Sequence, residues 1–424
     1  MEKILFIVHR IPFPPNKGDK IRSFNELKYL AQRHSVDLLC LADEPEDLKY
    51  KVDLEKLCNR VEVFPLSPRI AKIRGGMALL QGRALSSRYF YSKIMQRTFD
   101  AWLQTKEYDS IFCFSSSMAE YIFKSKALSQ LDSIKKPQLF MDFCDVDSDK
   151  WLQYAGDSSF PLNKLYHLEY RRLLKYEQRI QNYFNHTVLV STGEAELFYT
   201  HCPECKNLAV IPNGVDHQCF SPTCVDSTID LIAKKCAPAI VFTGAMDYPV
   251  NIKGVLWFIE EVWPHLQQRY PELLFYIVGS HPTAEIEALA ARTNIFVTGF
   301  VDDIRAYYKL ADVCVAPLHQ GRGVQNKVLE AMSMEKPVVA TSRANAGVQA
   351  VSGDHLLIAD TAKDFISMTC RLLDDPQQAN IIGRAARDYV ISCFDWETNM
   401  LALEALLLRP EKEGQAVGEE GMHD

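Results

Sequence analysis

Short apolar runs alternate along the chain with longer segments in which apolar side chains recur at helical spacing. Residues 4–8 (ILFIV) form the first run, residues 21–33 follow with helical spacing, and residues 36–41 form a second run. A continuous apolar run of this kind is typical of a strand that is buried on both faces. Further strands are predicted at residues 61–64, 110–114, 138–143 and 187–191. This alternation predicts an open parallel sheet with helices on both of its faces.

The same pattern starts again after the segment IPNG at residues 211–214. Strands are predicted at residues 239–243, 273–278, 295–297, 312–316 and 338–341, with helices such as 255–270 and 284–292 between them. We therefore expect an α/β protein with two Rossmann-like parallel-sheet domains, residues 1–210 and residues 211–390. A C-terminal helix at about residues 391–409 is expected to join the first domain, and residues 410–424 are too polar and glycine-rich to pack. Because ligands bind beyond the carboxyl ends of parallel strands, the two domains are expected to face each other across a cleft.

Length and charge agree with this organisation and argue against some classes of protein. A chain of 424 residues with 47% apolar composition exceeds the roughly 250 to 300 residues that one hydrophobic core usually serves. The formal net charge of -7 argues against a general nucleic-acid-binding protein. The N-terminal apolar run is too short for a signal peptide, and no segment approaches the roughly 20 apolar residues of a membrane span. The sequence predicts a cytoplasmic protein.

The 12 cysteines predict free thiols rather than disulfide bonds. They are scattered through apolar runs, where a thiol acts as a small core side chain, and disulfides are rare in the cytoplasm. Cys202, Cys205, Cys219 and Cys224 have a spacing loosely like that of a zinc ribbon. No metal is expected there, because the segment PNGVD between the two pairs belongs to a motif with another explanation.

Residues 312–341 contain the pattern that points most directly to a binding site. They read as a strand, a loop with Gly321 and Gly323, a helix and a second strand. A helix that begins after such a loop presents unpaired N–H groups to an anion. Lys327 suits a diphosphate, and Glu330, three residues later on the same helix face, suits sugar or ribose hydroxyls. The alternative is a surface ion pair between these two side chains.

Several motifs occur in an order that resembles one known family of enzymes. They are IPNGVD from residue 211, FTGAMDY from residue 242, FYIVGS from residue 275, VTGFVDDI from residue 297 and GRGVQNKVLEAM from residue 321. Together they resemble the GT-B glycosyltransferases of family 4, which are retaining enzymes that use nucleotide-sugar donors. The segment HRIPFPPNKGDKIRSFNEL from residue 9 is especially similar to the sugar transferases associated with bacterial exopolysaccharide and PEP-CTERM systems. The resemblance covers about residues 2–405.

The resemblance implies roles for residues in both domains. Lys327 would contact the donor diphosphate, Glu330 the ribose hydroxyls, and the loop at Gly244 the phosphates. The residues expected to flank the base are Gly279, Phe300 and Val301. In the N-terminal, acceptor-side domain, Gly18 and Asp19 would line the cleft near the phosphates and the transferred sugar. Asp142 and Asp145 would face the reacting sugar and are the candidate catalytic residues of this domain.

Two positions depart from the family pattern. Relatives usually carry a glutamate where this chain has Arg322, and an arginine where it has Ala245. We infer that Arg322 replaces the missing cation and reaches the same diphosphate, since guanidinium pairs with phosphate in bidentate fashion; the simpler interpretation is a solvent-exposed loop arginine. Lys253 before Gly254 resembles the usual lysine-glycine pair and is a weaker candidate for the donor site.

The chemistry implied by the resemblance requires neither a metal nor a cofactor. Departure of the nucleoside diphosphate is helped by cations and helix N-termini as negative charge develops on it. The segment Asp145-Val146-Asp147 matches a metal-binding pattern, but GT-B relatives lack a bound divalent ion, so it is interpreted as loop acidity.

The acceptor is indicated only by residues 69–97, in which basic side chains alternate with apolar ones and no acidic residue occurs. Such a segment can lie on the anionic inner face of the plasma membrane, and it can equally be an ordinary amphipathic surface. The resemblance implies a glycan or lipid-linked acceptor, because related enzymes often glycosylate lipid-linked intermediates at the cytoplasmic leaflet. Two other functions remain open: a GT-B-like nucleotide-sugar epimerase, and a noncatalytic protein that binds a nucleotide sugar.

Overall fold

The computed structural model describes residues 1–80, 82–223, 237–321 and 323–408. The chain divides into two compact units. Unit 1 contains Met1–Val188, Glu204–Ala209 and the residues from Met400 onward, and unit 2 contains Leu189–Pro203 and Val210–Asn399. The predicted tail at residues 410–424 lies outside the described residues.

Unit 1 is built on a seven-stranded sheet with the order β3-β2-β1-β4-β5-β6-β7. Its strands are β1 (Lys3–Val8), β2 (Ser35–Ala42), β3 (Arg60–Pro65), β4 (Ser110–Phe114), β5 (Gln138–Cys144), β6 (His186–Leu189) and β7 (Leu208–Val210). The apolar run of β1 is fully buried and pairs in parallel with β2 on one side and β4 on the other. The strand order reverses between β1 and β4, and open α/β sheets bind ligands at the carboxyl ends of strands beside such a reversal.

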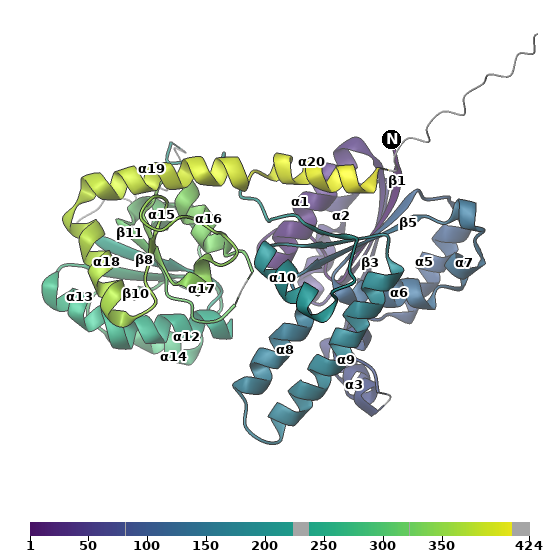
Figure 1. Ribbon diagram of the computed structural model, residues 1–424, viewed down its shortest axis with the longest axis horizontal. Coiled ribbons are helices and arrows are strands. Elements are labelled where there is room, and N and C mark those ends of the chain that lie inside the picture. The colour runs from purple at the N-terminus through teal and green to yellow at the C-terminus, as the bar shows by residue number, and fades with distance from the viewer. Residues whose placement is uncertain (81, 224–236, 322, 409–424) are drawn as a thin grey trace, which may run out of the picture. The chain divides into compact units, whose positions relative to one another are not determined.

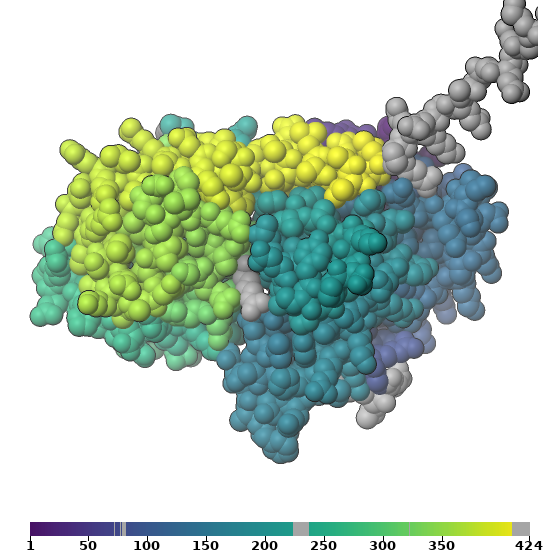
Figure 2. All heavy atoms as spheres, in the orientation of Figure 1, coloured from purple at the N-terminus to yellow at the C-terminus, as the bar shows by residue number. Residues whose placement is uncertain are grey.

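Helices of very different length connect these strands. They are α1 (Gly18–Arg33), α2 (Lys51–Glu55), α3 (Pro68–Leu80), α4 (Leu85–Tyr89), α5 (Lys93–Thr105), α6 (Ala119–Lys124), α7 (Lys126–Gln130), α8 (Asp147–Gly156) and α9 (Leu162–Tyr183), with short 3-10 turns at Pro45–Tyr50, Ser116–Met118 and Ser133–Lys135. The long α8–α9 hairpin projects from the body of unit 1 (Figures 1 and 2).

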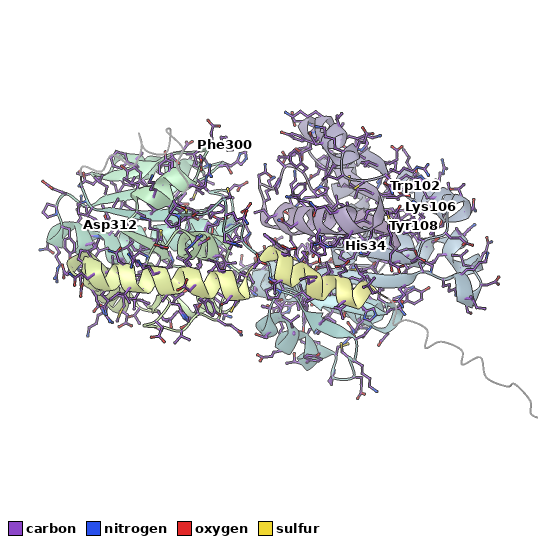
Figure 3. The ribbon with its side chains drawn as sticks, turned by 90° about the horizontal axis from the view of Figure 1, so that it is seen from above. His34, Trp102, Lys106, Tyr108, Phe300 and Asp312 are labelled. Carbon is purple, nitrogen blue, oxygen red and sulfur yellow. The ribbon has the colours of Figure 1, made fainter. Side chains whose placement is uncertain are left out.

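Polar contacts tie the helices of unit 1 to its sheet and to the C-terminal helix α20 (Trp396–Leu407). On α20, Glu404 binds His34 at 2.9 Å and accepts a hydrogen bond of 2.8 Å from Tyr29. Near the end of α5, Asp37 of β2 accepts hydrogen bonds from Lys106 at 2.9 Å and Tyr108 at 2.6 Å. Figure 3 labels His34, Lys106 and Tyr108 within this unit.

Unit 2 is built on a six-stranded sheet with the order β10-β9-β8-β11-β12-β13. Its strands are β8 (Ala239–Thr243), β9 (Leu274–Val278), β10 (Ile295–Val297), β11 (Val313–Ala316), β12 (Val338–Ala340) and β13 (Leu357–Ile358). All the pairings are parallel. The strand order reverses between β8 and β11, so the loops after these two strands are the expected ligand position.

The helices of unit 2 are α10 (Thr192–His201), α12 (Pro249–Trp257), α13 (Trp263–Arg269), α14 (Ala284–Glu287), α15 (Arg305–Leu310), α16 (Asn326–Ser333), α17 (Ser342–Asn345), α18 (Ala362–Asp374) and α19 (Pro376–Cys393). The single helix predicted at residues 255–270 is interrupted by a π turn at Phe258–Val262. Pro264 follows directly and cannot donate a backbone hydrogen bond, which accounts for the interruption.

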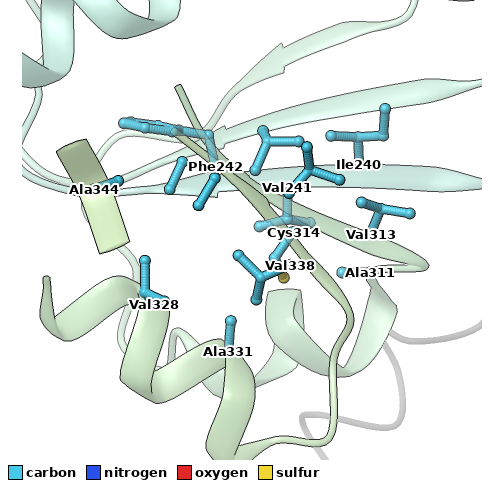
Figure 4. Packing of buried hydrophobic residues seen from close by; sticks show 14 of the residues in the cluster. Ile240, Val241, Phe242, Ala311, Val313, Cys314, Val328, Ala331, Val338 and Ala344 are labelled. Carbon is cyan, nitrogen blue, oxygen red and sulfur yellow. The ribbon is translucent and has the colours of Figure 1, made fainter. Parts of the chain in front are cut away.

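The core of unit 2 lies between its sheet and the surrounding helices. Figure 4 shows Val328 and Ala331 of α16 pointing toward the strand residues Cys314 and Val338, and all four are buried. This packing fixes α16 against β11 and β12, so its first turn is held at the carboxyl edge of the sheet. The two parallel sheets confirm the predicted α/β class with two Rossmann-like domains.

Candidate active site

Two glycines bring the loops after β8 and β9 into direct contact. Gly244 and Gly279 have φ angles of 154° and 151°, a region that side chains other than glycine rarely adopt. A Cβ atom on Gly279 would lie 1.7 Å from the carbonyl oxygen of Gly244. The close approach is held by a 2.9 Å hydrogen bond from the Gly244 amide to the carbonyl of Val278. The two loops therefore approach each other more closely than any side chain at position 279 would allow.

Lys327, in the first turn of α16, lies against this glycine loop. A Cβ atom on Gly244 would be 2.9 Å from the Lys327 Nζ. The N-cap residue Gln325 makes no side-chain cap hydrogen bond within the described residues. The amide of Val328 donates a 2.9 Å hydrogen bond to the Gln325 carbonyl, so the amides that can face an anion are the first two of α16, those of Asn326 and Lys327. The structure thus brings together the glycine loop, a cation and a helix N-terminus, three features that favour binding of phosphate groups.

The surroundings of Lys327 alter its charge near neutral pH. Its Nζ donates a 2.6 Å hydrogen bond to Asn251 Oδ1 and lies 4.2 Å from the centre of the Phe242 ring. Burial lowers the pKa of Lys327 to about 7, although the nearby Glu330 carboxylate acts to raise it. An anion bound beside the ammonium would favour the charged form and raise this pKa again.

Glu330 is held in place by a chain of hydroxyl groups. Tyr308 donates a 2.7 Å hydrogen bond to Glu330 Oε2, and its hydroxyl lies 2.8 Å from Thr243 Oγ1. Burial raises the pKa of Glu330 to about 7, while the hydrogen bond from Tyr308 and the charge of Lys327 act to lower it. The hydrogen bond from Tyr308 therefore fixes the orientation of the Glu330 carboxyl group.

Two residues of this region were not predicted from the sequence. Asn251 of α12 binds Lys327 and also donates a 2.8 Å hydrogen bond to the carbonyl of Ala245, so it supports both sides of the glycine loop. Gly347 packs on the loop that precedes α16, where a Cβ atom would lie 2.6 Å from the amide nitrogen of Val324 and 2.7 Å from the carbonyl carbon of Gly323. Both contacts join residues far apart in the chain, so no local pattern could have indicated them.

The structure describes three further residues of unit 2 that were predicted for the donor site. Phe300 is 72% exposed on the loop after β10, and Figure 3 labels it in unit 2. Val301 packs against the core. Lys253 is exposed on α12 and donates a 3.4 Å hydrogen bond to Gln320, near the glycine loop. The predicted phosphate contact Arg322 lies outside the described residues.

In unit 1, Gly18 and Asp19 begin helix α1. Asp19 Oδ2 lies 2.8 Å from Arg10 and 3.3 Å from His9, and Arg10 also binds Asp43 at 2.9 Å. Burial alone would raise the pKa of Asp19, but the hydrogen bonds and charges of His9 and Arg10 hold it well below its usual value. His9 and Arg10 directly follow β1, so this ionised group stands beside the strand reversal of the unit 1 sheet.

The prediction that Asp142 faces the reacting sugar requires correction. Its side chain is fully buried, and Oδ2 accepts a 2.8 Å hydrogen bond from Arg22 while Oδ1 accepts one of 2.6 Å from the amide of Cys144. Burial and the neighbouring Asp142 raise the pKa of Glu26, the third member of this buried group, well above its usual value. Asp142 therefore neutralises a buried arginine and has no surface for a ligand.

Asp145 lies at the surface end of the same loop. Its carboxylate is 25% exposed and 2.9 Å from Lys150. The loop leaves the sheet through Cys144, whose φ of 66° is in the left-handed region, and the loop after β4 leaves through Ser115 with a φ of 79°. Non-glycine residues in this conformation cluster at functional loops, and the sequence contained no signal for them.

The sequence predicted neither a bound metal ion nor a membrane-spanning helix, and the described residues bear on both predictions. Within the described residues, no group of three or more His, Cys, Asp or Glu side chains is placed to hold a metal ion. Cys224 of the possible zinc ribbon lies outside them. None of the helices in the described ranges combines the length and the apolar composition needed to cross a bilayer.

Comparison with solved structures identifies the fold. The sucrose-phosphate synthase of Thermosynechococcus elongatus superposes with a TM-score of 0.71 over 96% of this chain and 98% of that chain, at 18% identity. Anabaena HepE, solved in complex with UDP, has a TM-score of 0.67 over 96% and 99% of the two chains, also at 18% identity. The protein therefore has the GT-B fold of two parallel-sheet α/β domains.

Sequence comparison adds the class of the C-terminal domain. Residues 237–375 match the family described as Glycosyl transferases group 1. An uncharacterised protein of the cps region of Klebsiella pneumoniae is 24% identical over 373 residues, which are 85% of this chain and 88% of that protein. A GDP-mannose-dependent mannosyltransferase of Mycolicibacterium smegmatis is 29% identical over 159 residues, 34% of this chain and 42% of that protein. Unit 2 thus contains a group 1 glycosyltransferase domain, and this domain holds Gly244, Lys327 and Glu330.

Proposed function

We propose that the protein is a retaining glycosyltransferase of family 4 that moves a sugar from a nucleotide-sugar donor to a glycan or lipid-linked acceptor. The observation that carries the proposal is the position of Lys327, which lies against the Gly244 loop at the N-terminus of α16. A cation, a glycine backbone and a helix N-terminus at one place are suited to a diphosphate. The anchored carboxylate of Glu330 on the same helix is suited to ribose hydroxyls.

Each residue of unit 2 has a separate task in this proposal. Lys327 and the Gly244 loop bind the diphosphate, Glu330 binds the ribose, and Gly279 with the backbone at Phe300–Val301 flanks the base. Gly323 contributes a position without a side chain to the loop before α16, and Lys253 and Arg322 are further candidates for phosphate contacts. In unit 1, Gly18, Asp19 and Asp145 are proposed to line the position of the transferred sugar.

The chemical step in this proposal depends on charge stabilisation. Negative charge grows on the diphosphate as the bond to the sugar breaks, and a cation beside it lowers the barrier more than it strengthens ground-state binding. Because Lys327 is only partly charged in the empty site, binding of the diphosphate and protonation of the amine reinforce each other. The nucleotide sugar is a substrate, and we propose that neither a metal nor another cofactor takes part.

The biological role proposed is synthesis of bacterial exopolysaccharide or another cell-surface polysaccharide, in PEP-CTERM-type systems. It is supported by the relative from a cps region and by the resemblance of residues 9–27 to exopolysaccharide sugar transferases. Exposed Ile70, Ile73 and Ile94 lie in the basic segment 69–97, which supports contact of this segment with the inner face of the plasma membrane.

A thermal-shift screen tests the donor side of the proposal. UDP, GDP, ADP and dTDP are compared on the wild type and on Lys327→Ala, because a ligand that binds the folded state raises apparent stability. UDP and GDP are the first candidates, since HepE was solved with UDP and the mycobacterial relative uses GDP-mannose. Stabilisation by one diphosphate that is lost in the variant supports the proposal, and no response to any of them contradicts it.

Product analysis then separates transfer from the alternatives. The donor sugar is followed by mass spectrometry and by the anomeric configuration of the product. Conversion of the donor to an isomer without any acceptor would indicate an epimerase, and nucleotide binding without turnover would indicate a noncatalytic protein. An inverted anomeric configuration would contradict the retaining mechanism.

A further inference from the structure

Unit 1 contains a group of basic side chains that surrounds a single carboxylate. Glu120 lies in the first turn of α6, and its side chain is 6% exposed. Its Oε1 atom is 2.5 Å from Lys124 Nζ, 3.5 Å from Arg83 Nη1 and 3.9 Å from Arg88 Nε. These four residues are called the Glu120 cluster below. Arg83 and Arg88 belong to the basic segment 69–97, so the structure directs two of its cations toward one point.

The Glu120 cluster has more positive than negative charge. One carboxylate balances one cation, and the remaining like charges repel each other at these short distances. Burial lowers the pKa of Lys124 and, although Glu120 raises it, Arg88 and Arg83 lower it further. In the described part of the chain, Glu120 is the acidic side chain that forms ion pairs with these three cations. A further anion would therefore reduce the repulsion among them.

The donors of the Glu120 cluster are prepared for a ligand. Arg88 Nε is buried and makes no hydrogen bond within the described part of the chain, and it lies 3.9 Å from Glu120 Oε1. Lys124 Nζ is held by Glu120 Oε1 at 2.5 Å and lies 3.6 Å from the centre of the Tyr91 ring. The side chains as a whole remain accessible, because Arg83 is 50% exposed and Arg88 and Lys124 are each 24% exposed. Partly exposed cations with unused hydrogen-bonding capacity bind phosphate groups well, and arginine does so in bidentate fashion.

The Glu120 cluster also lies near the ligand-binding edge of the unit 1 sheet. Helix α6 follows β4 after the 3-10 turn Ser116–Met118. Two residues after Arg88, the Phe90 ring lies 5.0 Å from the ring of His9, which follows β1. Tyr121 donates a 2.9 Å hydrogen bond to the carbonyl of Phe90 and so joins α6 to the end of α4. The cluster is thus connected to β1 and β4, the two strands between which the strand order reverses.

We propose that Arg83, Arg88 and Lys124 bind a phosphate or diphosphate group carried by the acceptor. This inference rests on the proposed function, in which unit 1 takes the acceptor. A dianion would balance the two positive charges that Glu120 leaves, and it would reach them from the solvent side, because Arg83 is 50% exposed and Arg88 and Lys124 are each 24% exposed. The alternative is that the three cations serve only to hold Glu120 and fasten α6 to α4.

Titration calorimetry with inorganic pyrophosphate tests the site directly. It is performed on Lys327→Ala, in which the donor site has lost its cation, so that the second site dominates. Adding Arg83→Gln and Arg88→Gln should weaken pyrophosphate binding at least about tenfold, because charge-assisted hydrogen bonds are lost. The matched control adds Lys93→Gln and Arg97→Gln, an equal change in charge at exposed positions of α5, and should change affinity less than about twofold. If the variant with both arginine substitutions and the control variant bind pyrophosphate with equal affinity, the proposal is overturned.

Glu120→Gln provides a second test with the opposite sign. Removing the competing carboxylate should increase pyrophosphate affinity several-fold, because the three cations then face the ligand without a counter-charge. If Glu120 is merely a structural anchor, this variant will instead melt at a lower temperature and bind pyrophosphate no better than its parent, and the proposal falls. This result also decides the question if the double arginine variant does not fold.

Vesicle sedimentation distinguishes the source of the phosphate group. Binding to phosphatidylglycerol but not phosphatidylcholine vesicles, competed by pyrophosphate and lost in the double arginine variant, assigns the site to a phosphate at the membrane. Pyrophosphate binding without sedimentation assigns it to an acceptor free in solution. The thermal-shift screen distinguishes failure of the proposed function from failure of this inference. If the proposed function is wrong, nucleotides will not stabilise the wild type, but the arginine-dependent binding of pyrophosphate will persist. Conversely, nucleotide stabilisation without arginine-dependent pyrophosphate binding removes this inference and leaves the proposed function standing.

Discussion

Replacing Lys327 with alanine is expected to abolish most sugar transfer while leaving unit 2 folded. The amine contributes one 2.6 Å hydrogen bond to Asn251, whose other hydrogen bond of 2.8 Å to Ala245 persists without it. The glycine loop therefore keeps its support. Burial already lowers the pKa of Lys327 to about 7, which means that the folded protein holds this cation at a cost. Its removal should leave the melting temperature unchanged or slightly higher.

The expected loss of activity follows from the contact with the leaving group. A single donor aimed at developing negative charge typically contributes about 2.7–4 kcal/mol to the transition state, or about 100- to 1,000-fold in kcat. The pH dependence is a second signature. Lys327 is charged below its pKa and neutral above it, and a bound diphosphate raises that pKa. Affinity for the diphosphate should thus fall by up to about tenfold per pH unit above a pH of about 7.

The assay compares initial rates of transfer and calorimetric affinities for the nucleoside diphosphate across the neutral pH range. Lys363→Ala, which removes an exposed lysine of α18 in the same unit, is the matched control and should behave like the wild type. Rates of Lys327→Ala within about threefold of the wild type would refute the reasoning. So would an unchanged fall in affinity with pH, because that dependence must then come from another group.

Three further outcomes are expected. Glu330→Gln should weaken nucleotide binding about tenfold, because a neutral amide replaces a charged acceptor for ribose hydroxyls; unchanged affinity by calorimetry would leave Glu330 as a structural partner of Lys327. Gly279→Ala should eliminate nucleotide stabilisation in a thermal-shift assay, since the new methyl group would meet the carbonyl of Gly244 at 1.7 Å; normal binding would show that the loops can separate. Asp142→Asn should lower the free energy of unfolding by about 3 kcal/mol, because a buried arginine loses its charged partner. The KM for the donor should not change in the protein that remains folded. A selective loss of kcat with normal stability would restore Asp142 as a catalytic candidate.

The elements of both sheets could be read from the sequence, because buried parallel strands need continuous apolar runs. The runs at residues 4–8, 36–41 and 239–243 became β1, β2 and β8 with nearly the predicted bounds. The short strands β7 and β13 and the break between α12 and α13 were not predicted. Strands of three and two residues are too short to form a recognisable apolar run. The break is followed by Pro264, which cannot donate a backbone hydrogen bond.

The arrangement of Lys327 and Glu330 was likewise determined locally, since their spacing on one helix places them on one face whatever surrounds it. Their partners were not. Asn251 reaches Lys327 across 76 residues of sequence, and Tyr308 reaches Glu330 across 22. A pattern in the chain can indicate which side chains share a face, but burial, and with it the pKa of each group, depends on what the rest of the fold places beside them.

Asp142 is a residue whose role was predicted wrongly because its partner is distant in the sequence. Its position at the end of a strand, in a loop expected to meet the ligand, favoured a catalytic role, and the sequence contained nothing against it. Arg22, 120 residues away, occupies its carboxylate in the core. By itself the sequence determined the strands, the glycine loops and the cation that follows one of them, because each depends on neighbours in the chain. Only the tertiary structure decided which charged groups form ion pairs with each other and which remain accessible to a ligand, because that depends on contacts between distant segments.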